Sequence, residues 1–267
     1  MKIKRLGLIF LAWLMGAAQI GLADTANHFY FAQITDTHMG VLDHNERTQK
    51  AVAAINRIQS KLKDRLAFTV HTGDFAEELT LDAQAMARAR SIMDKLKTPV
   101  HYVPGNNDIR VKKPMATRRT WETTMGPQIT SAEYQGVVFI FANTEPLAQD
   151  FEMTGYDPMA AIEGFMAQAQ GKPIILFHHS PCIGKFKKGK TQKGWPKATR
   201  TQWISLLNKY GVKAVIAGHF HQDEMHWLGE VPLFSSPPIS SRWGRQAAFR
   251  VFEYKDGRIG YRTQYLQ

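Results

Sequence analysis

The stretch "FYFAQITDTH" (Phe29–His38) decides the fold, because it joins an apolar strand pattern directly to two polar groups. Residues 29–35 form a short, largely apolar run that is strand-like. Asp36 and His38 follow at once. A helix is predicted next, since apolar residues recur at helical spacing: Ala51, Ile55, Ile58 and Leu62.

Strand and helix patterns continue to alternate along the chain. Further strands are predicted at 66–72, 99–103, 137–142, 173–177 and 212–218. Met86, Met93 and Leu96 mark a second amphipathic helix. A third is predicted at 157–171, with Asp157 as N-cap, Pro158 in the first turn and Gly171 as the stop, and a fourth at 201–211. This alternation predicts a layered α/β fold. From Val231 onwards the pattern is strand-rich, with a turn at Asp256–Gly257, and predicts strands that complete or cover a sheet.

The first 23 residues have the layout of a secretory signal peptide. A basic start, "MKIKR", precedes an apolar run (Leu6–Gly21) and small residues at Gly21 and Ala23, so cleavage is predicted after Ala23. The run is shorter than the ~20 residues of a spanning helix, although an uncleaved anchor is the alternative. We therefore expect a single domain over 24–267, without a membrane span, in the periplasm or secreted.

Composition narrows the class of protein. With 44% hydrophobic and 21% charged residues, the chain can bury a core. Its single cysteine, Cys182, excludes an internal disulfide; a thiol beside a proline suits a small buried group better than a nucleophile. The formal net charge of +11 becomes +8 without Lys2, Lys4 and Arg5, which favours an anionic ligand. Nucleic acid is compatible but not favoured, because no helix-turn-helix, RNA-recognition or OB-like signature is present.

Chemistry-bearing residues collect immediately after five predicted strands. They are Asp36 and His38; Asp74; Asn106, Asn107 and Asp108; His178 and His179; and His219 and His221. Ligands of open α/β sheets bind at the carboxyl ends of the strands. Mixed oxygen and nitrogen donors suit Mn, Fe, Zn or Co, and so many donors indicate two ions. Two such ions can clamp the oxygens of a phosphoryl displacement. Glycines before Asp74, Asn106 and His219 allow tight turns there.

In this order the motifs resemble the calcineurin-like metallophosphoesterase superfamily: Asp-x-His, Gly-Asp, Gly-Asn-x-Asp, His-x-Pro and Gly-His-x-His, over Phe29–His221. The resemblance implies a four-layer α/β/β/α sandwich with two mixed β-sheets flanked by helices, and a dinuclear metal centre. It also implies that one ion is held by Asp36, His38 and His221, that Asp74 bridges, and that the other is held by Asn106, His179 and His219. His179 is chosen over His178 because His-Ser-Pro matches the motif.

Asn107 departs from that family pattern, which usually has a histidine there. The resemblance places Asp74, Asn107 and Asp108 among the catalytic residues, yet an amide cannot donate the proton that the family histidine gives. Such a proton is typically worth ~10²–10⁴-fold in rate. Either substrates with good leaving groups are preferred, or His44, His71 or His178 replaces the missing group, or the metal centre serves another purpose.

Two basic segments leave strand ends that carry these residues. The first holds Arg110, Lys112, Lys113, Arg118 and Arg119; the second is a predicted loop, Lys185–Arg200. Both can either border the site or form solvated surface. Trp195 in the loop can stack on a base or sugar, or pin the loop to the core.

The leading hypothesis is an exported metal-dependent phosphoric ester hydrolase. A metal-bridging hydroxide would attack phosphorus in line, with phosphodiesters somewhat favoured over monoesters and a nucleotide or glycerophosphodiester as a small substrate. The alternative is a non-catalytic metal-dependent protein that binds a phosphate ligand. The sequence does not decide the natural substrate, the metal or the oligomeric state.

Overall fold

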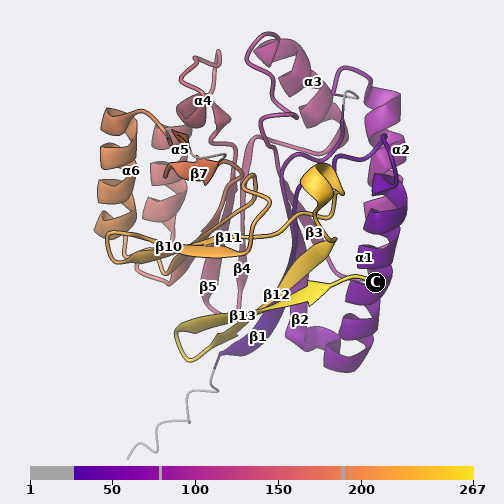
Figure 1. The fold of residues 1–267 in the computed structure, drawn as a ribbon. Helices are drawn as coiled ribbons and strands as arrows, with labels where there is room; N and C mark the ends of the chain where they lie inside the picture. The colour runs from indigo at the N-terminus through magenta and orange to yellow at the C-terminus, as the bar shows by residue number, and fades with distance from the viewer. Residues whose placement is uncertain (1–26, 78–79, 188–189, 193) are drawn as a thin grey trace, which may run out of the picture.

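The computed structural model describes residues 27–267 except 78–79, 188–189 and 193 (Figure 1). The predicted signal peptide and its cleavage site lie outside these residues. The strands are β1 (His28–Ile34), β2 (Leu66–Thr72), β3 (Val100–Val103), β4 (Ile129–Tyr134), β5 (Val137–Ala142), β6 (Ile174–Phe177), β7 (Lys185–Lys187), β8 (Lys190–Gln192), β9 (Ala214–Ala217), β10 (Glu224–Leu228), β11 (Val231–Ser235), β12 (Ala248–Lys255) and β13 (Arg258–Tyr265). The α-helices are α1 (His44–Leu62), α2 (Ala83–Met93), α3 (Pro114–Thr124), α4 (Glu145–Ala148), α5 (Pro158–Gln168) and α6 (Lys197–Lys209), and the short 3-10 helices are η1 (Lys63–Arg65) and η2 (Arg242–Gly244).

Two mixed sheets form the centre of the molecule. The first has the strand order β13-β12-β1-β2-β3, in which β1, β2 and β3 are parallel, β12 is antiparallel to β1, and β13 is antiparallel to β12. The second has the order β10-β11-β9-β6-β5-β4, with a parallel centre and an antiparallel strand at each edge. The C-terminal strands therefore complete both sheets.

Helices cover the outer face of each sheet, so that the chain forms four layers (Figure 1). Helices α1 and α2 pack on the first sheet through buried residues such as Ile55 and Met93. Helices α5 and α6 pack on the second sheet, where Ile162 and Trp203 are buried. The predicted four-layer sandwich with two mixed β-sheets is confirmed.

The layer between the sheets is largely aromatic. Phe31 stacks on Phe68 and on Phe252, with ring centroids 5.2 and 5.0 Å apart, and meets Phe177 of the opposite sheet edge-on. Large rings of this kind bury much apolar surface each. This core holds the two sheets face to face, and the carboxyl ends of their parallel strands lie at the same edge of the molecule.

Several elements were not predicted. The edge strands β4 and β10 and the helix α3 were missed because they carry few buried residues. The segment 185–200 was expected to be a loop, but it contains the paired strands β7 and β8 and the start of α6. Among the described residues, no helix is long and apolar enough to cross a membrane.

Candidate metal centre

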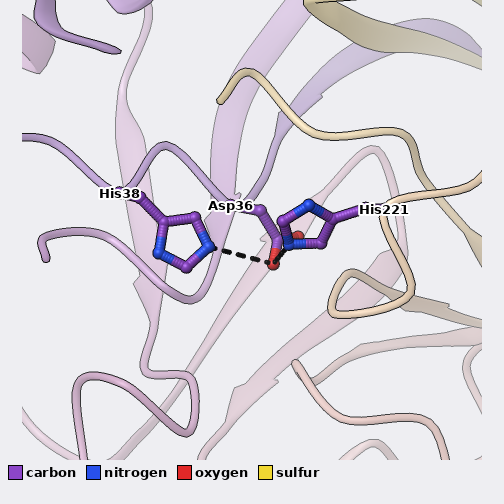
Figure 2. Close-up of side chains that lie close together, drawn as sticks. All are labelled: Asp36, His38 and His221. Carbon is purple, nitrogen blue, oxygen red and sulfur yellow. Dashed lines mark ion pairs between the residues drawn. The ribbon is translucent and has the colours of Figure 1, made fainter. Parts of the chain in front are cut away.

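Two groups of potential metal ligands lie at the edge where the parallel strands end. The first group comprises Asp36, His38 and His221 (Figure 2), and the second comprises Asp74, His179 and His219. Within each group the donor atoms all lie within 4.8 Å of one another. The structure thus brings together the residues that the sequence indicated, from the ends of β1, β2, β6 and β9.

In the first group, the carboxylate of Asp36 lies between two imidazoles. Its Oδ1 is 2.9 Å from His221 Nε2 and 3.9 Å from His38 Nε2, the two contacts drawn in Figure 2. All three side chains are buried. The other carboxylate oxygen, Oδ2, accepts hydrogen bonds from Thr35 Oγ1 and from the backbone N–H of His219, which fixes the orientation of the carboxylate.

In the second group, Asp74 lies beside His179, with 3.3 Å between Oδ1 and Nε2. His179 Nδ1 donates to the carbonyl oxygen of Thr72 at 2.7 Å, so its Nε2 faces the group. Asn106 Oδ1 is 3.2 Å from the same Nε2. His219 completes the group as an exposed residue, so this group has access to solvent.

Asp74 also connects the two groups. Its Oδ2 is 3.7 Å from His38 Nε2, while its Oδ1 faces His179. One carboxylate therefore presents one oxygen to each group, which is the arrangement that a bridging ligand requires.

Five of these residues have left-handed backbone conformations. The φ angles are 51° at Asp36, 44° at His38, 53° at Asp74, 66° at His219 and 53° at His221. A non-glycine residue with positive φ is uncommon and costs on the order of 1–3 kcal/mol. Such strain clusters at functional sites, where the surrounding structure holds the backbone in the conformation that the site requires.

Glycines bring the strand ends together at the second group. An added Cβ at Gly105 would lie 2.4 Å from both N and Oδ1 of Asp74, and one at Gly73 would lie 2.5 Å from His179 Nδ1. At Gly218 a Cβ would lie 2.7 Å from Asp36 Oδ2. The glycines before Asp74, Asn106 and His219 thus serve close approach, and Gly73 in addition has a φ of +93°.

The residues present fit a metal ion. His38 Nε2 is buried and has no hydrogen-bond partner among the described residues, although buried polar groups are normally paired. Its Nδ1 is held by Glu77, so the unpaired Nε2 carries the lone pair that a metal accepts. Carboxylate oxygens and imidazole nitrogens together are a donor set for borderline transition metals.

The charges of the cluster stabilise one another. Burial alone would raise the pKa of Asp36, but the neighbouring His221 and His179 outweigh it and hold that pKa well below its usual range. Burial likewise opposes ionisation of His179, yet the charges of Asp74 and Asp36 raise its pKa well above the usual value. A bound cation would take the place of the imidazolium protons, because imidazole ligates metals only in its neutral form.

Glu77 is a site residue that the sequence analysis missed. Its Oε2 accepts a hydrogen bond of 2.8 Å from His38 Nδ1, and its Oε1 pairs with Arg242 at 2.5 Å. A carboxylate behind a ligand histidine fixes the ring orientation and raises its basicity. A single glutamate three residues after Asp74 carries no motif signal; the isolated bridge between Met39 and Ala76 brings it to His38.

The other two predicted catalytic residues differ in surroundings. Asn107 is half-buried, and its backbone N–H and side-chain Nδ2 donate to the two oxygens of Asp74 at 2.8 and 3.1 Å. Asp108 is buried and accepts hydrogen bonds from the backbone N–H groups of Gly105 and Phe75. Burial and the nearby charge of Asp74 raise the pKa of Asp108 to about 7. These contacts make Asp108 a brace for the turn that carries Asn106 and Asn107.

The histidines considered as substitutes for the family histidine lie in enclosed positions. Burial lowers the pKa of His71 and of His178 to about 3. His178 packs between Trp195 and Trp203, on the face opposite to His179. His44 donates from Nδ1 to the carbonyl oxygen of His38, and burial lowers its pKa as well. Neutral, enclosed rings of this kind are poor proton donors.

The basic segments make mostly structural contacts. Trp195 is buried and donates from Nε1 to the carbonyl oxygen of Ser180, so it pins its segment to the core. Arg118 pairs with Glu122 within α3, and Arg110 Nε donates to the carbonyl oxygen of Asn107. Lys185 also borders the site, where its ammonium contacts the carbonyl oxygen and the ring of Phe220.

A cavity of about 220 Å³ opens beside the second group. Asn106 and His219 line it together with Ser180, Lys185, Trp195 and Phe220. A larger hollow of about 700 Å³ lies between α1 and β13, away from both groups. The smaller cavity borders the second group and can hold part of a ligand bound at the metal centre.

Residues 29–223 match the family model for the calcineurin-like phosphoesterases, which covers most of the chain. The chain belongs to the calcineurin-like phosphoesterase family. It is similar to the mouse serine/threonine-protein phosphatase CPPED1, with 24% identity over 81% of this chain and 77% of the relative. A probable cyclic nucleotide phosphodiesterase of Pseudoalteromonas sp. (strain SM9913) is 23% identical over 93% of this chain and 88% of its own.

Solved structures share the fold at low sequence identity. GAP50, described as the anchor in the inner membrane complex of Plasmodium, superposes with a TM-score of 0.62 at 14% identity, covering 90% of this chain and 84% of its own. A putative 5'-nucleotidase from Staphylococcus aureus superposes with a TM-score of 0.57 at 12% identity, covering 90% and 54%. At these identities the likeness supports the fold alone.

Proposed function

We propose that this protein is a metal-dependent phosphoric ester hydrolase. In this proposal Asp36, His38 and His221 hold one ion, His179, His219 and Asn106 hold the other, and Asp74 bridges. The observation that carries the proposal is the position of Asp74, which presents one oxygen to each of two His/carboxylate groups. When bound there, two ions would supply Lewis acidity for phosphoryl transfer to water.

The chain's own residues would orient this chemistry. Glu77 fixes the ring of His38, and the carbonyl oxygen of Thr72 fixes that of His179. Both rings thereby keep Nε2 directed at the site. The side-chain amide of Asn107 donates one hydrogen bond to Asp74, and its second N–H can donate to a phosphoryl oxygen. Asp108 holds that turn in place through its bonds to Gly105 and Phe75.

The amide at Asn107 supports a preference for phosphodiesters over phosphomonoesters. It stabilises charge but supplies no proton to a leaving oxygen. His71 and His178 are buried and neutral, and therefore do not replace it. Esters whose leaving groups need little protonation are expected to react fastest.

Small phosphodiesters are the proposed substrate class, and the protein is proposed to act on them after export. One relative is named a probable cyclic nucleotide phosphodiesterase, which supports a nucleotide, and the cavity beside His219 can hold part of such a ligand. Export rests on the N-terminal pattern of residues 1–23. Fractionation with N-terminal sequencing tests it: a chain beginning at Asp24 outside the cytoplasm is expected, and a cytoplasmic chain that keeps Met1 refutes it.

The test of function compares an aryl phosphodiester with the matching aryl phosphomonoester. Protein loaded with Mn²⁺ or with Zn²⁺ would be assayed beside Asp74→Asn, which loses the bridging charge. Faster diester turnover, lost in the variant, is the expected result. Faster monoester turnover would refute the diester preference. Turnover no higher than that of the variant would refute the hydrolase. It would favour a protein that binds a phosphate ligand through the metals without catalysis, an alternative that the amide at Asn107 supports.

A further inference from the structure

One of the buried ligand histidines has no hydrogen bond that fixes its ring. His38 and His179 each donate from Nδ1 to an oxygen, so that Nε2 faces the site. The Nδ1 of His221 is buried and has no hydrogen-bond partner among the described residues. Its ring contacts that of Trp243, with centroids 4.6 Å apart, but a ring contact does not choose which nitrogen faces a metal. The placement of His221 therefore depends on its backbone.

The backbone of His221 is held in an uncommon conformation from both sides. Its φ of 53° lies in the left-handed region, and such a conformation persists where the surrounding structure determines it. On the N-terminal side, the backbone N–H of His219 donates to Asp36 Oδ2 at 3.0 Å. On the C-terminal side, the side chain of Asp223 is fastened to the first sheet. The loop is thus anchored at His219 and at Asp223, with His221 between them.

Three side chains of β12 and β13 donate hydrogen bonds to Asp223. Arg250 Nη2 lies 2.5 Å from Oδ1, and the hydroxyl oxygen of Tyr261 lies 3.3 Å from the same oxygen. The hydroxyl of Thr263 donates to Oδ2. The guanidinium of Arg250 also lies over the ring of Tyr261, 4.0 Å from its centroid. Both oxygens of the carboxylate are therefore held by the C-terminal strands.

Arg250 is the buried cation of this cluster. Its side chain is 0% exposed, although arginine is almost never fully buried unless it is paired. Asp223 is its only acidic partner among the described residues, so the burial of this cation depends on one residue of the loop. Arg250 lies beyond residues 29–223, which match the family model, and it therefore belongs to none of the matched motifs.

We propose that Arg250 is a positioning residue for the first ligand group, because it holds, through Asp223, the loop that carries His221. This rests on the proposed function, in which His221 ligates one of two ions. The second group takes its ligands from other turns and from His219, whose own backbone bond to Asp36 does not involve Arg250. Loss of Arg250 should therefore weaken the ion of the first group and spare the ion of the second.

Variants that keep one ligand group intact separate the two ions. His219→Ala keeps the first group, and His221→Ala keeps the second. In the His219→Ala protein, Arg250→Met should weaken Zn²⁺ binding by about 10-fold in a chelator competition, the low end of the range for residues behind a metal ligand. In the His221→Ala protein, the same change should leave Zn²⁺ binding unaltered. Arg250→Lys keeps a cation beside Asp223 and should restore part of the lost affinity.

A double variant separates positioning from stability. Arg250→Met alone leaves the Asp223 carboxylate without its cation and should also lower the stability measured by urea unfolding. Adding Asp223→Asn removes the second charge and should recover stability, whereas Zn²⁺ binding at the first group should remain weak. Arg90→Met is the matched control, since Arg90 pairs with Asp94 at the end of α2; it should leave Zn²⁺ binding at both groups unchanged.

The outcomes distinguish this proposal from the hydrolase. Equal weakening at both groups, unchanged binding at the first group, or affinity that recovers together with stability in the double variant would overturn the positioning role of Arg250. No Zn²⁺ binding by the His219→Ala protein would overturn both that role and the assignment of the first ion. A loss confined to the first group, in a protein that hydrolyses no ester, would refute the hydrolase and leave the role of Arg250 in place.

Discussion

Replacing Gly105 with alanine tests whether close approach of the strand ends builds the second ligand group. The new Cβ would lie 2.4 Å from the backbone nitrogen of Asp74 and equally close to its Oδ1, and 2.8 Å from His179 Cδ2. Ordinary contact begins at 3.4 Å, so these atoms must separate by about 1 Å. Rotation of the Asp74 side chain cannot relieve the clash, because one of the atoms is backbone.

The expected magnitude follows from that displacement. Overpacking of this kind costs about 1–3 kcal/mol of unfolding free energy. A shift of about 1 Å in a catalytic group can cost ~10²-fold in rate. Gly105→Ala should therefore lower both stability and ester hydrolysis, and the loss of hydrolysis should remain under conditions where the variant is fully folded.

Urea unfolding and aryl phosphodiester hydrolysis would be measured on the same preparations. Gly164→Ala is the matched control, because Gly164 lies inside α5 and an added Cβ there meets no atom within 4 Å. That variant should be more stable by about 0.5–1 kcal/mol with unchanged hydrolysis. A Gly105→Ala protein with wild-type stability and hydrolysis would refute the steric account of the site.

Three further predictions concern single residues. Glu77→Gln should weaken metal binding by about 10–100-fold in a chelator competition, because the carboxylate orients His38; unchanged affinity would contradict this role. Asn107→His should raise monoester hydrolysis more than diester hydrolysis, and an equal rise in both would remove the account of the amide. Burial lowers the pKa of His101 from 6.5 to about 4, so the unfolded chain takes up its proton first. The stability that this neutral ring contributes is present above pH 6.5 and is lost as the pH falls toward 4. His101→Phe keeps a ring stacked on Phe141 and should lose less stability between pH 7 and pH 4.5 in urea unfolding than the wild type; an equal loss would refute the assignment.

Strongly patterned elements could be predicted from the sequence. The strands at Leu66–Thr72 and Val137–Ala142 have the predicted bounds, since their apolar runs are bounded by polar or turn residues. Asp157 caps α5 as expected, accepting from the backbone N–H groups of Met159 and Ala160. The candidate ligands could be found for the same reason, since each lies within a few residues of the end of a predicted strand.

Elements and residues that depend on distant parts of the chain could not be predicted. Strand β10 alternates exposed and half-buried residues and pairs with β11 at the sheet edge, so its own sequence carries little apolar signal. Helix α3 buries only Thr117, Trp121 and Thr124. Glu77 belongs to no motif, and only the folded chain brings it to His38.

Metal content per chain is the measurement that tests the central claim most directly. Wild type, His221→Ala and His219→Ala would be loaded with Zn²⁺, dialysed and analysed by inductively coupled plasma mass spectrometry. Trp227→Ala is the control, because Trp227 is an exposed residue of β10 and belongs to neither ligand group. Two ions per chain in the wild type and the control, and one in each histidine variant, is the predicted result. A wild-type protein that retains no metal, or histidine variants that retain as much as the wild type, would contradict the assignment of the two ligand groups.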